Sequence, residues 1–208
     1  MTVIIAHAAA GRAFIAGDTK RSGMPLPVRK VHVWSDQVLF GQAGNGTYMS
    51  KAIAAAFACQ GLHGDDLAGL IASFDAARKA VYPQSVAANA NSSLAAGTLL
   101  IACSDPASGG PSIWTIELDP TVAPTLQAGP VFGIGTVGIA ASAAALWAGG
   151  VVAANTLPTW ATACISAHRG PTVAWPIDMV VAQPSLPGER AVLHQRLASP
   201  TSTPDPGF

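Results

Sequence analysis

The fold is decided by the stretch Thr2-Val3-Ile4-Ile5-Ala6 and, after a turn at Gly11-Arg12, by Ala13-Phe14-Ile15-Ala16-Gly17-Asp18. Both runs are rich in apolar and β-branched residues, which favour buried strands. Two such runs joined by a glycine turn predict an antiparallel pair. The second strand ends on the carboxylate of Asp18, and the next predicted strand opens with Lys30. A carboxylate and an ammonium are thus carried to strand ends near one another.

The rest of the chain reads as further strands and helices. Apolar or alternating runs predict strands at residues 30–34, 37–44, 97–102, 112–118 and 172–182. Alanine-rich runs predict helices at residues 47–60, 65–81, 137–148 and around 160–167, the second of them closing before Pro83. Two consecutive helices between two sets of strands are typical of a sheet that is covered on one side.

Composition favours one domain. The chain has 208 residues, half of them hydrophobic, and its short loops offer no obvious linker. We expect a single domain over residues 1–197, followed by a disordered tail over 198–208, which is rich in Pro, Ser and Thr. No basic region opens the chain, and His7 and Arg12 interrupt its first apolar run, so no secretory signal is expected. We therefore expect a cytoplasmic location.

The low charge of the chain argues against nucleic acid as a partner and favours self-association. Charged residues make up 11% of the chain and cancel to a net charge of zero, so no basic face is expected to neutralise the phosphates of a nucleic acid. So low a charged fraction is unusual for a solitary soluble monomer. We therefore expect that much of the apolar surface is buried between copies of the chain.

Thr2 carries the candidate chemistry. A threonine hydroxyl is inert at its ordinary pKa, but a free α-amine on the same residue titrates at about 7.7–8.0 and can take the hydroxyl proton. Removal of Met1 would therefore give a chain whose first residue supplies both the nucleophile and the base. A small second residue is also common where methionine is merely trimmed, and this plainer interpretation stays open.

Several segments together resemble the β-subunits of proteasomes, and more closely the HslV-type bacterial proteases and related bacterial homologues. They are Thr2-Val3-Ile4, Gly17-Asp18, Arg29-Lys30-Val31, Gly41-Gln42-Ala43-Gly44 and Gly133-Ile134-Gly135. The resemblance implies the fold of N-terminal nucleophile hydrolases: an α+β, four-layer αββα sandwich of two antiparallel sheets. It also implies a threonine endopeptidase that assembles into stacked homo-oligomeric rings, acts on polypeptides without a cofactor or metal, and allows an ATP-dependent unfoldase as partner.

Carried over residue by residue, the resemblance makes Thr2 the nucleophile and base, and Lys30 the cation that tunes it. Asp18 would orient Lys30, and Gly44 would donate to the oxyanion. An ammonium beside the Thr2 amine disfavours a second positive charge, and an opposite charge within ~4–6 Å keeps Lys30 ionised. Gln42 is expected to line the specificity pocket. Alone, Asp18 and Lys30 could form an ordinary surface ion pair, and Lys20 competes with Lys30.

The chain also departs from the family pattern. Ile134 stands between two glycines where proteasome subunits have a serine that supports the N-terminal amine, and beside Gly135 the hydroxyl of Thr136 could replace it. The aspartate that follows the last long helix in those subunits has no counterpart in residues 167–171. Two alternatives therefore remain open: a ring subunit with weak or no activity, which retention of Met1 would favour, and a small-molecule amidase of the same class.

Other site types have weaker support. Residues 131–154 could span a bilayer in length, but Gly133, Gly135 and Gly149-Gly150 interrupt them, and a core helix is expected instead. The G-x-G-x-x-G match at residues 133–138 lacks the acidic residue that a dinucleotide site needs ~20 positions later. Three cysteines without C-x-x-C spacing and five scattered histidines predict neither a disulfide framework nor a metal site.

Overall fold

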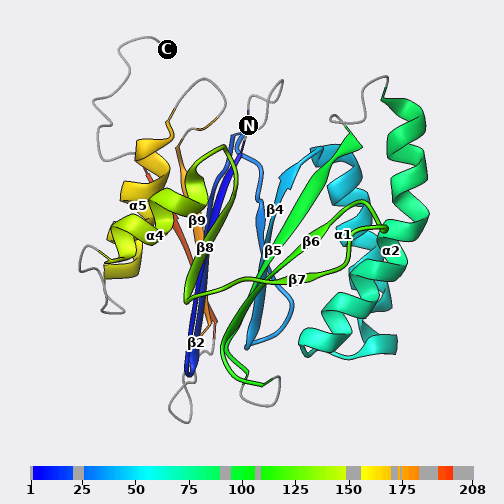
Figure 1. Ribbon diagram of the computed structural model, residues 1–208, viewed down its shortest axis with the longest axis horizontal. Coiled ribbons are helices and arrows are strands. Elements are labelled where there is room, and N and C mark those ends of the chain that lie inside the picture. The colour runs from blue at the N-terminus through cyan, green and yellow to red at the C-terminus, as the bar shows by residue number, and fades with distance from the viewer. Residues whose placement is uncertain are drawn as a thin grey trace.

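The computed structural model describes residues 2–20, 26–89, 95–105, 109–148, 156–169, 173, 175–182 and 192–198. Its helices form two outer layers and its strands two inner sheets (Figure 1). The strands are β1 (Val3–Ala9), β2 (Arg12–Asp18), β3 (Val31–Val33), β4 (Val38–Gly44), β5 (Gly97–Cys103), β6 (Ser112–Glu117), β7 (Thr125–Leu126), β8 (Val131–Gly135), β9 (Ile177–Ala182) and β10 (Val192–Leu197). The helices are α1 (Gly46–His63), α2 (Leu67–Ala88), α4 (Ile139–Ala148) and α5 (Leu157–Ala167).

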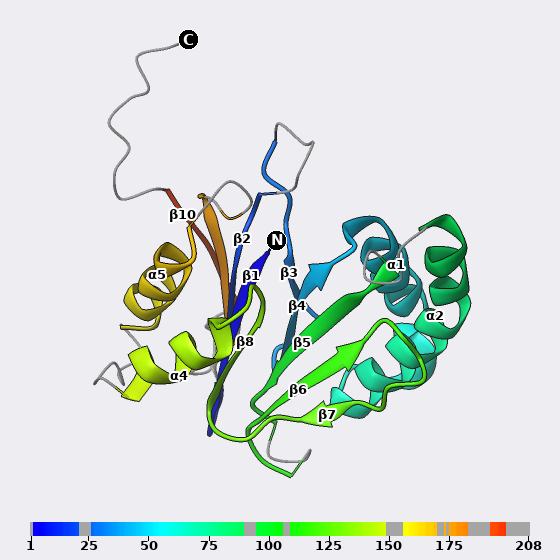
Figure 2. The same ribbon diagram turned by 45° about the horizontal axis from the view of Figure 1, so that its top comes forward.

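Both described sheets are antiparallel throughout. The first has the strand order β10-β9-β2-β1-β8 and the second β3-β4-β5-β6-β7. Helices α4 and α5 cover the outer face of the first sheet, and α1 and α2 cover that of the second (Figure 2). The expected α+β, four-layer αββα sandwich is therefore confirmed.

The position of β1 explains why its sequence is apolar without alternation. Val3 and Ile5 pack toward α4 and α5, whereas Ile4 points the other way and packs against Leu39 and Leu100 of the second sheet. Successive side chains of a strand point to opposite faces. Because both faces of β1 are covered, every position from Val3 to Ala6 is buried, and the run has no polar side.

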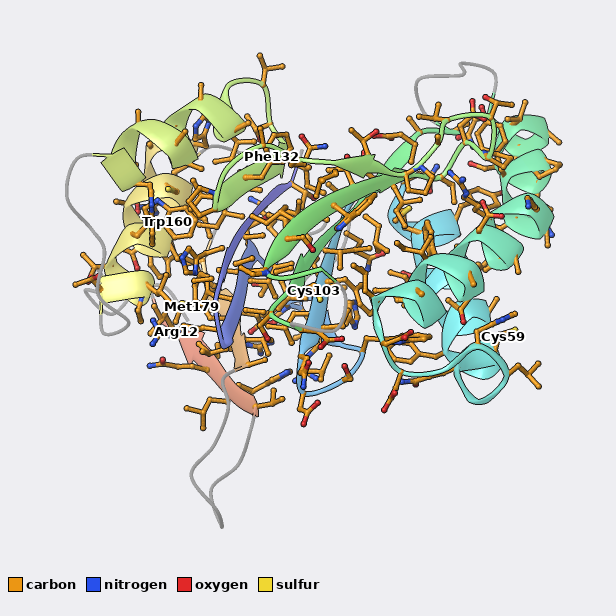
Figure 3. The ribbon with its side chains drawn as sticks, turned by 60° about the horizontal axis from the view of Figure 1, so that its bottom comes forward. Arg12, Cys59, Cys103, Phe132, Trp160 and Met179 are labelled. Carbon is orange, nitrogen blue, oxygen red and sulfur yellow. The ribbon has the colours of Figure 1, made fainter. Side chains whose placement is uncertain are left out.

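The layer of α4 and α5 is anchored by an aromatic cluster. Trp160 is fully buried and donates its indole N–H to the carbonyl oxygen of Ala143 at 3.1 Å. Met179 of β9 belongs to the same core cluster, and both side chains lie in the layer between the first sheet and these helices (Figure 3). Trp147 packs edge-on against Trp160, with ring centroids 5.5 Å apart. Helix α4, which lies within the alanine-rich segment expected to form a core helix, contributes Ile139 and Ala143 to this core.

The helix that was predicted to close before Pro83 continues to Ala88 with Pro83 inside it, so the predicted end is wrong. Pro83 is exposed, and water can solvate the carbonyl that its missing N–H leaves free. Beyond the proline, Ser85 is buried and donates its Oγ to the carbonyl oxygen of Ala95 at 3.1 Å, which holds the added turn of the helix.

Other element boundaries differ less. The predicted strand at residues 172–182 is shorter, since β9 begins at Ile177, and the sequence analysis missed the edge strands β7 and β10. Leu126 of β7 and Leu193 of β10 are both exposed, so these strands lack the strong apolar pattern of central strands. The predicted disordered tail lies, apart from Ala198, outside the described residues.

No helix within the described parts of the chain is both long enough and apolar enough to cross a bilayer. The three cysteines lie in different layers. Cys103 is buried on β5 and Cys164 on α5, while Cys59 is partly exposed on α1, well away from Cys103 (Figure 3). All three are free thiols.

Candidate active site

The side chain of Lys30 joins two of the predicted site residues. Its Nζ donates to Oδ2 of Asp18 at 2.9 Å and to Oγ1 of Thr2 at 3.1 Å. It also donates to the backbone carbonyl oxygen of Lys20. One ammonium therefore touches a carboxylate, a carbonyl and the hydroxyl of the candidate nucleophile, and the structure brings Thr2, Asp18 and Lys30 into one cluster.

The strands place these residues by register. Ile4 of β1 pairs with Gly17 of β2, so the start of β1 lies beside the end of β2. The backbone N–H of Val3 donates to Oδ1 of Asp18 at 2.7 Å and ties the two strand ends together. Lys30 directly precedes β3, and its carbonyl oxygen accepts from the N–H of Gln42 at 2.9 Å. The first sheet thus supplies Thr2 and Asp18, and the second sheet supplies Lys30.

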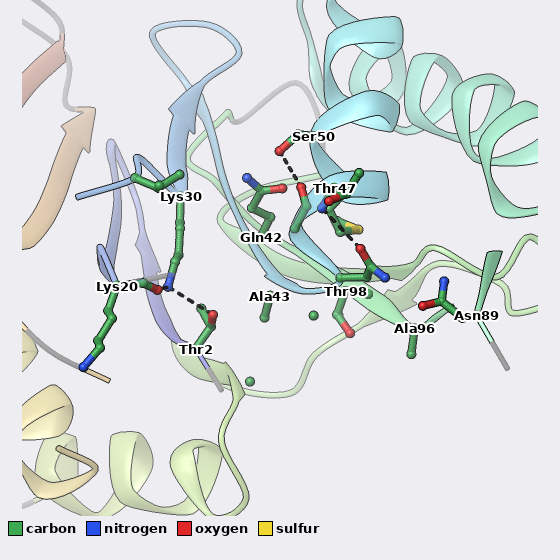
Figure 4. A pocket seen from close by; sticks show the side chains of 17 residues that line it. Thr2, Lys20, Lys30, Gln42, Ala43, Thr47, Ser50, Asn89, Ala96 and Thr98 are labelled. Atoms are coloured by element: carbon green, nitrogen blue, oxygen red, sulfur yellow. Dashed lines mark hydrogen bonds between the residues drawn. The ribbon is translucent and has the colours of Figure 1, made fainter. Parts of the chain in front are cut away.

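The ion pair lies inside the protein and is not an ordinary surface pair. Asp18 is fully buried and Lys30 is 7% exposed. Burial raises the pKa of Asp18, while the Lys30 ammonium and the N–H groups of Val3 and Lys20 favour the carboxylate and oppose that rise. The competing Lys20 contributes only backbone groups here, and its ammonium points away from Thr2 (Figure 4).

Gly135 and Thr136 hold the backbone of Thr2 from the other side. The hydroxyl of Thr136 donates to the carbonyl oxygen of Thr2 at 3.2 Å. Gly135 has a φ of 109°, and a Cβ there would overlap the same carbonyl oxygen, so only glycine fits. Thr136 therefore supports Thr2 through its carbonyl, whereas the sequence analysis expected support of the amine. Ile134, which replaces the family's serine, is buried between the two sheets.

Gly44 ends β4 beside this cluster with a φ of 99°. A Cβ at this position would lie 2.5 Å from Cα of Gly97, so the close approach of β5 also demands glycine. The N–H of Gln42 donates to the carbonyl oxygen of Lys30, and the N–H of Asn45 donates to that of Ala96, the residue just before β5. Because N–H groups alternate along a strand, that of Gly44 points away from β5, to the side on which Lys30 lies. This is the direction that an oxyanion donor needs.

A cavity of about 570 Å³ opens in front of Thr2. It extends past Gln42 and Gly44 to the first turn of α1, to Asn89 at the end of α2, and to Thr98 on β5 (Figure 4). Its volume lies within the range of roughly 300–1,000 Å³ that is usual for ligand pockets. The described lining contains the two lysines, Lys20 and Lys30, and no acidic side chain.

Sequence reasoning missed part of the lining. Thr47 and Ser50 come from the first turn of α1, and Asn89 and Thr98 come from segments far away in the sequence. The start of α1 could be recognised from the sequence, because Asn45 is a favoured N-cap residue and accepts from the N–H groups of Thr47 and Tyr48. Nothing local to Asn89 or Thr98 distinguishes them from ordinary surface residues, so only the fold reveals their place.

Comparisons with known proteins bear on the fold. No protein-family model and no curated protein matches the chain. Among solved structures, it is similar to Anbu (ancestral beta-subunit) from Yersinia bercovieri, with a TM-score of 0.71 and 11% identity over 95% of this chain and 87% of that chain. It is also similar to an Anbu Gly-1 mutant from Hyphomicrobium sp. strain MC1, with a TM-score of 0.70 and 11% identity over 96% and 88% of the two chains.

These structures correct the family resemblance. The chain was expected to resemble proteasome β-subunits of the HslV type most closely, but the similar structures are Anbu proteins, a distinct family. The quoted segments around Thr2, Asp18 and Lys30 are strand ends that the shared sandwich brings together, and they do not separate one family of this fold from another. At 11% identity, the likeness shows the fold alone: the chain shares the fold of these Anbu structures.

Proposed function

We propose that the chain is a threonine-type peptidase whose nucleophile is Thr2, exposed by cleavage between Met1 and Thr2. The observation that carries this proposal is the contact of the Lys30 ammonium with both the Thr2 hydroxyl and the buried Asp18 carboxylate, at 3.1 and 2.9 Å. A cation held there by an internal carboxylate favours the neutral, basic form of a free Thr2 amine. The arrangement faces a cavity in which a substrate carbonyl can lie.

The reaction proceeds in two halves. Oγ1 of Thr2 attacks the carbonyl carbon of a peptide bond while the α-amine of Thr2 takes the hydroxyl proton. The oxyanion accepts from the N–H of Gly44, and the leaving amine takes the proton back as the C–N bond breaks. Water then attacks the resulting ester and gives one proton to the α-amine, which passes it to Oγ1 of Thr2 as the ester C–O bond breaks. The product leaves as a carboxylic acid and loses its remaining proton to solvent.

Polypeptides suit the cavity better than small amides do. Gly44, Gly46 and Gly97 line it, so backbone groups face the substrate without side chains in front of them. An extended peptide binds through its own backbone to exposed backbone groups of this kind. This favours the peptidase over the small-molecule amidase.

Self-association belongs to the proposal. Large apolar side chains are exposed at separate places, with Leu62 at the end of α1 81% exposed and Val137 before α4 93% exposed. Together with the low charged fraction, they support assembly into closed rings, since repeated head-to-tail contacts form rings when the rotation closes. Sedimentation velocity would test this part, which requires a homo-oligomer much larger than the 21.0 kDa chain.

The activity is tested with a fluorescein-labelled, unfolded protein, which offers peptide bonds next to every side chain. A chain that starts at Thr2 is expected to digest it, and Thr2→Ser is expected to retain activity. Thr2→Ala should lose activity by orders of magnitude, since loss of a catalytic nucleophile costs on the order of 10⁶ in kcat in a serine hydrolase. Equal digestion by Thr2→Ala, or none by the Thr2 chain, would reject the proposal.

A further inference from the structure

One buried polar group in the cavity has an oxygen that the protein leaves unsatisfied. Gln42 on β4 is 7% exposed, and its Oε1 is buried without a hydrogen-bond partner among the described residues. Its side chain lies between Lys30 and the first turn of α1 (Figure 4). A buried acceptor without a partner is unfavourable, and the terminal torsion of glutamine is broad, so a small rotation can present this amide to a ligand.

A neighbouring hydroxyl presents an acceptor as well. Ser50 donates its proton to the carbonyl oxygen of Gly46 at 2.6 Å, so oxygen lone pairs are what it has left for the cavity. Thr98 pairs with Ala43 and therefore lies on the other face of the sheet from Gln42, which pairs with Leu99. Gln42 and Ser50, called here the amide wall, favour a ligand that donates hydrogen bonds.

The two kinds of polar group on the Gln42 amide restrict which donor fits. Lys20 and Lys30 are the charged side chains of the described lining, but Asp18 pairs with Lys30 and the Lys20 ammonium points away from Thr2, so charge is not what excludes a cationic donor. A lysine ammonium can only donate, and it would leave Nε2 of Gln42 without an acceptor. A carboxamide supplies an NH₂ donor together with a carbonyl that can accept from Nε2 of Gln42.

The position of Gln42 links this wall to the reaction. Gln42 and Gly44 are two residues apart on β4, so their side-chain positions share one face of the strand. A peptide whose carbonyl oxygen reaches the N–H of Gly44 brings the side chain of the same residue next to Gln42. The amide wall therefore contacts the side chain of the substrate residue that provides the attacked carbonyl.

Resting on the proposed peptidase reaction, we infer that the amide wall selects substrates with a carboxamide side chain, glutamine or asparagine, on the residue that provides the attacked carbonyl. A site built to hydrogen-bond a substrate group discriminates against analogues that lack it, because its own polar groups are then left unpaired. The pairing works for either orientation of the Gln42 amide, since both partners carry one donor and one acceptor group.

The test is a series of fluorogenic peptides that differ only in this residue: glutamine, asparagine, glutamate, methionine or lysine. With the chain that starts at Thr2, kcat/KM for the better carboxamide is expected to exceed that for methionine and lysine by about 10-fold or more. Gln42→Leu should reverse the order in favour of methionine. Gln60→Leu, the same exchange at a glutamine on α1 outside the cavity, should keep the original order. A preference for methionine, lysine or glutamate in the unaltered chain, or an unchanged order in Gln42→Leu, would overturn the inference.

Binding separates this inference from the proposed reaction. The full chain with Thr2→Ala should bind the uncleaved glutamine or asparagine peptide about 10-fold more tightly than the methionine peptide by calorimetry, and adding Gln42→Leu should abolish the difference. If the Thr2 chain cleaves nothing but this difference holds, the reaction is wrong and the wall is right. If it cleaves peptides and Thr2→Ala shows no such difference, the wall is wrong and the reaction stands.

Discussion

The corner formed by Thr2, Lys30 and the buried Asp18 borders the same cavity as the amide wall of Gln42 and Ser50, but the two treat their buried polar atoms in opposite ways. Asp18 accepts from Val3, Lys20 and Lys30, so its charge is satisfied before any substrate arrives. The buried oxygen of Gln42 has no partner in the described protein. The corner has its hydrogen bonds formed before a substrate binds, as a reaction centre needs. The amide wall keeps an acceptor without a partner, which a bound substrate can satisfy.

Loss of the cation should break the corner. Lys30→Met leaves the buried Asp18 carboxylate unpaired, so the free energy of unfolding is expected to fall by about 3–5 kcal/mol. Activity should fall by ~10²–10⁴, the usual scale of proton-transfer catalysis. Residual activity should also rise with pH at a higher midpoint, because nothing then opposes protonation of the Thr2 amine.

The matched control is Lys51→Met, which removes an exposed lysine of α1 that lies over the ring of Tyr48. Denaturant titrations and pH–rate profiles of the two variants measure the difference. If Lys30→Met kept the original pH midpoint, Lys30 would have no part in tuning the amine.

A side chain placed against the Thr2 carbonyl oxygen should displace Thr2 without changing any charged residue. In Gly135→Ala the new Cβ overlaps the Thr2 carbonyl oxygen, and a φ of 109° is unfavourable for alanine. A displacement of this kind can cost about 10²-fold in rate. Gly61→Ala is the control: a Cβ on this α1 glycine meets nothing within 4 Å, so a gain of about 0.5–1 kcal/mol is expected. Full peptidase activity of Gly135→Ala would show that the position of Thr2 is not held there.

Acid should weaken the fold at places outside the cavity. Burial, with a smaller effect of Arg12, lowers the pKa of His7 to about 4, and burial with Arg29 and His194 lowers that of His32 to about 4. Both are neutral in the fold, while the unfolded chain takes up protons near pH 6.5. Stability is therefore complete above about pH 6.5 and is lost as the pH falls toward about 4.

Melting temperatures between pH 7.5 and 4.5 measure this loss. His7→Phe, which keeps a ring against Trp147, removes one of the two groups and should flatten the decline. Identical slopes for His7→Phe and the unaltered chain would mean that His7 does not resist protonation. This measurement shows whether the loss of stability in acid arises from His7, which lies outside the cavity, and not from the corner or the amide wall.

The smallest effect should come from the wall. Gln42→Leu removes an acceptor that has no partner and should leave the free energy of unfolding unchanged or slightly higher. Gln60→Leu removes a bond of 2.8 Å from Nε2 to the carbonyl oxygen of Trp34 and should cost about 1 kcal/mol. Chemical denaturation of both variants gives the comparison. A greater loss in Gln42→Leu than in Gln60→Leu would show that Gln42 stabilises the free protein and is not reserved for a ligand.

The sequence predicted the layers well because strand and helix periodicity is local information. The runs at Thr2 to Ala6 and Ala13 to Asp18 are apolar on both faces, and a strand between two covered faces requires that pattern. Edge strands such as β10 carry exposed side chains and have no such signature. The helix was predicted to end before Pro83 because proline lacks a backbone N–H. The exposed position of Pro83 makes that missing N–H tolerable, and the helix continues.

The site was only partly readable for a similar reason. Asp18 and Lys30 stand at ends of predicted strands, so their meeting follows from the order of the strands. Their burial does not follow, and neither do the contacts of Val3 and Lys20 with Asp18, which depend on backbone direction. The family resemblance failed because the same strand ends serve several families of one fold.

The central claim is that Thr2 acts with its hydroxyl and its own amine together, and labelling by a peptide epoxyketone tests it most directly. The reagent forms its stable adduct only with both groups. After treatment with epoxyketones that carry several different side chains, intact mass should show one adduct on the chain that starts at Thr2. Neither Thr2→Ala nor a chain that keeps Met1 should be labelled. An unlabelled Thr2 chain, or an adduct on the chain that keeps Met1, would contradict the claim.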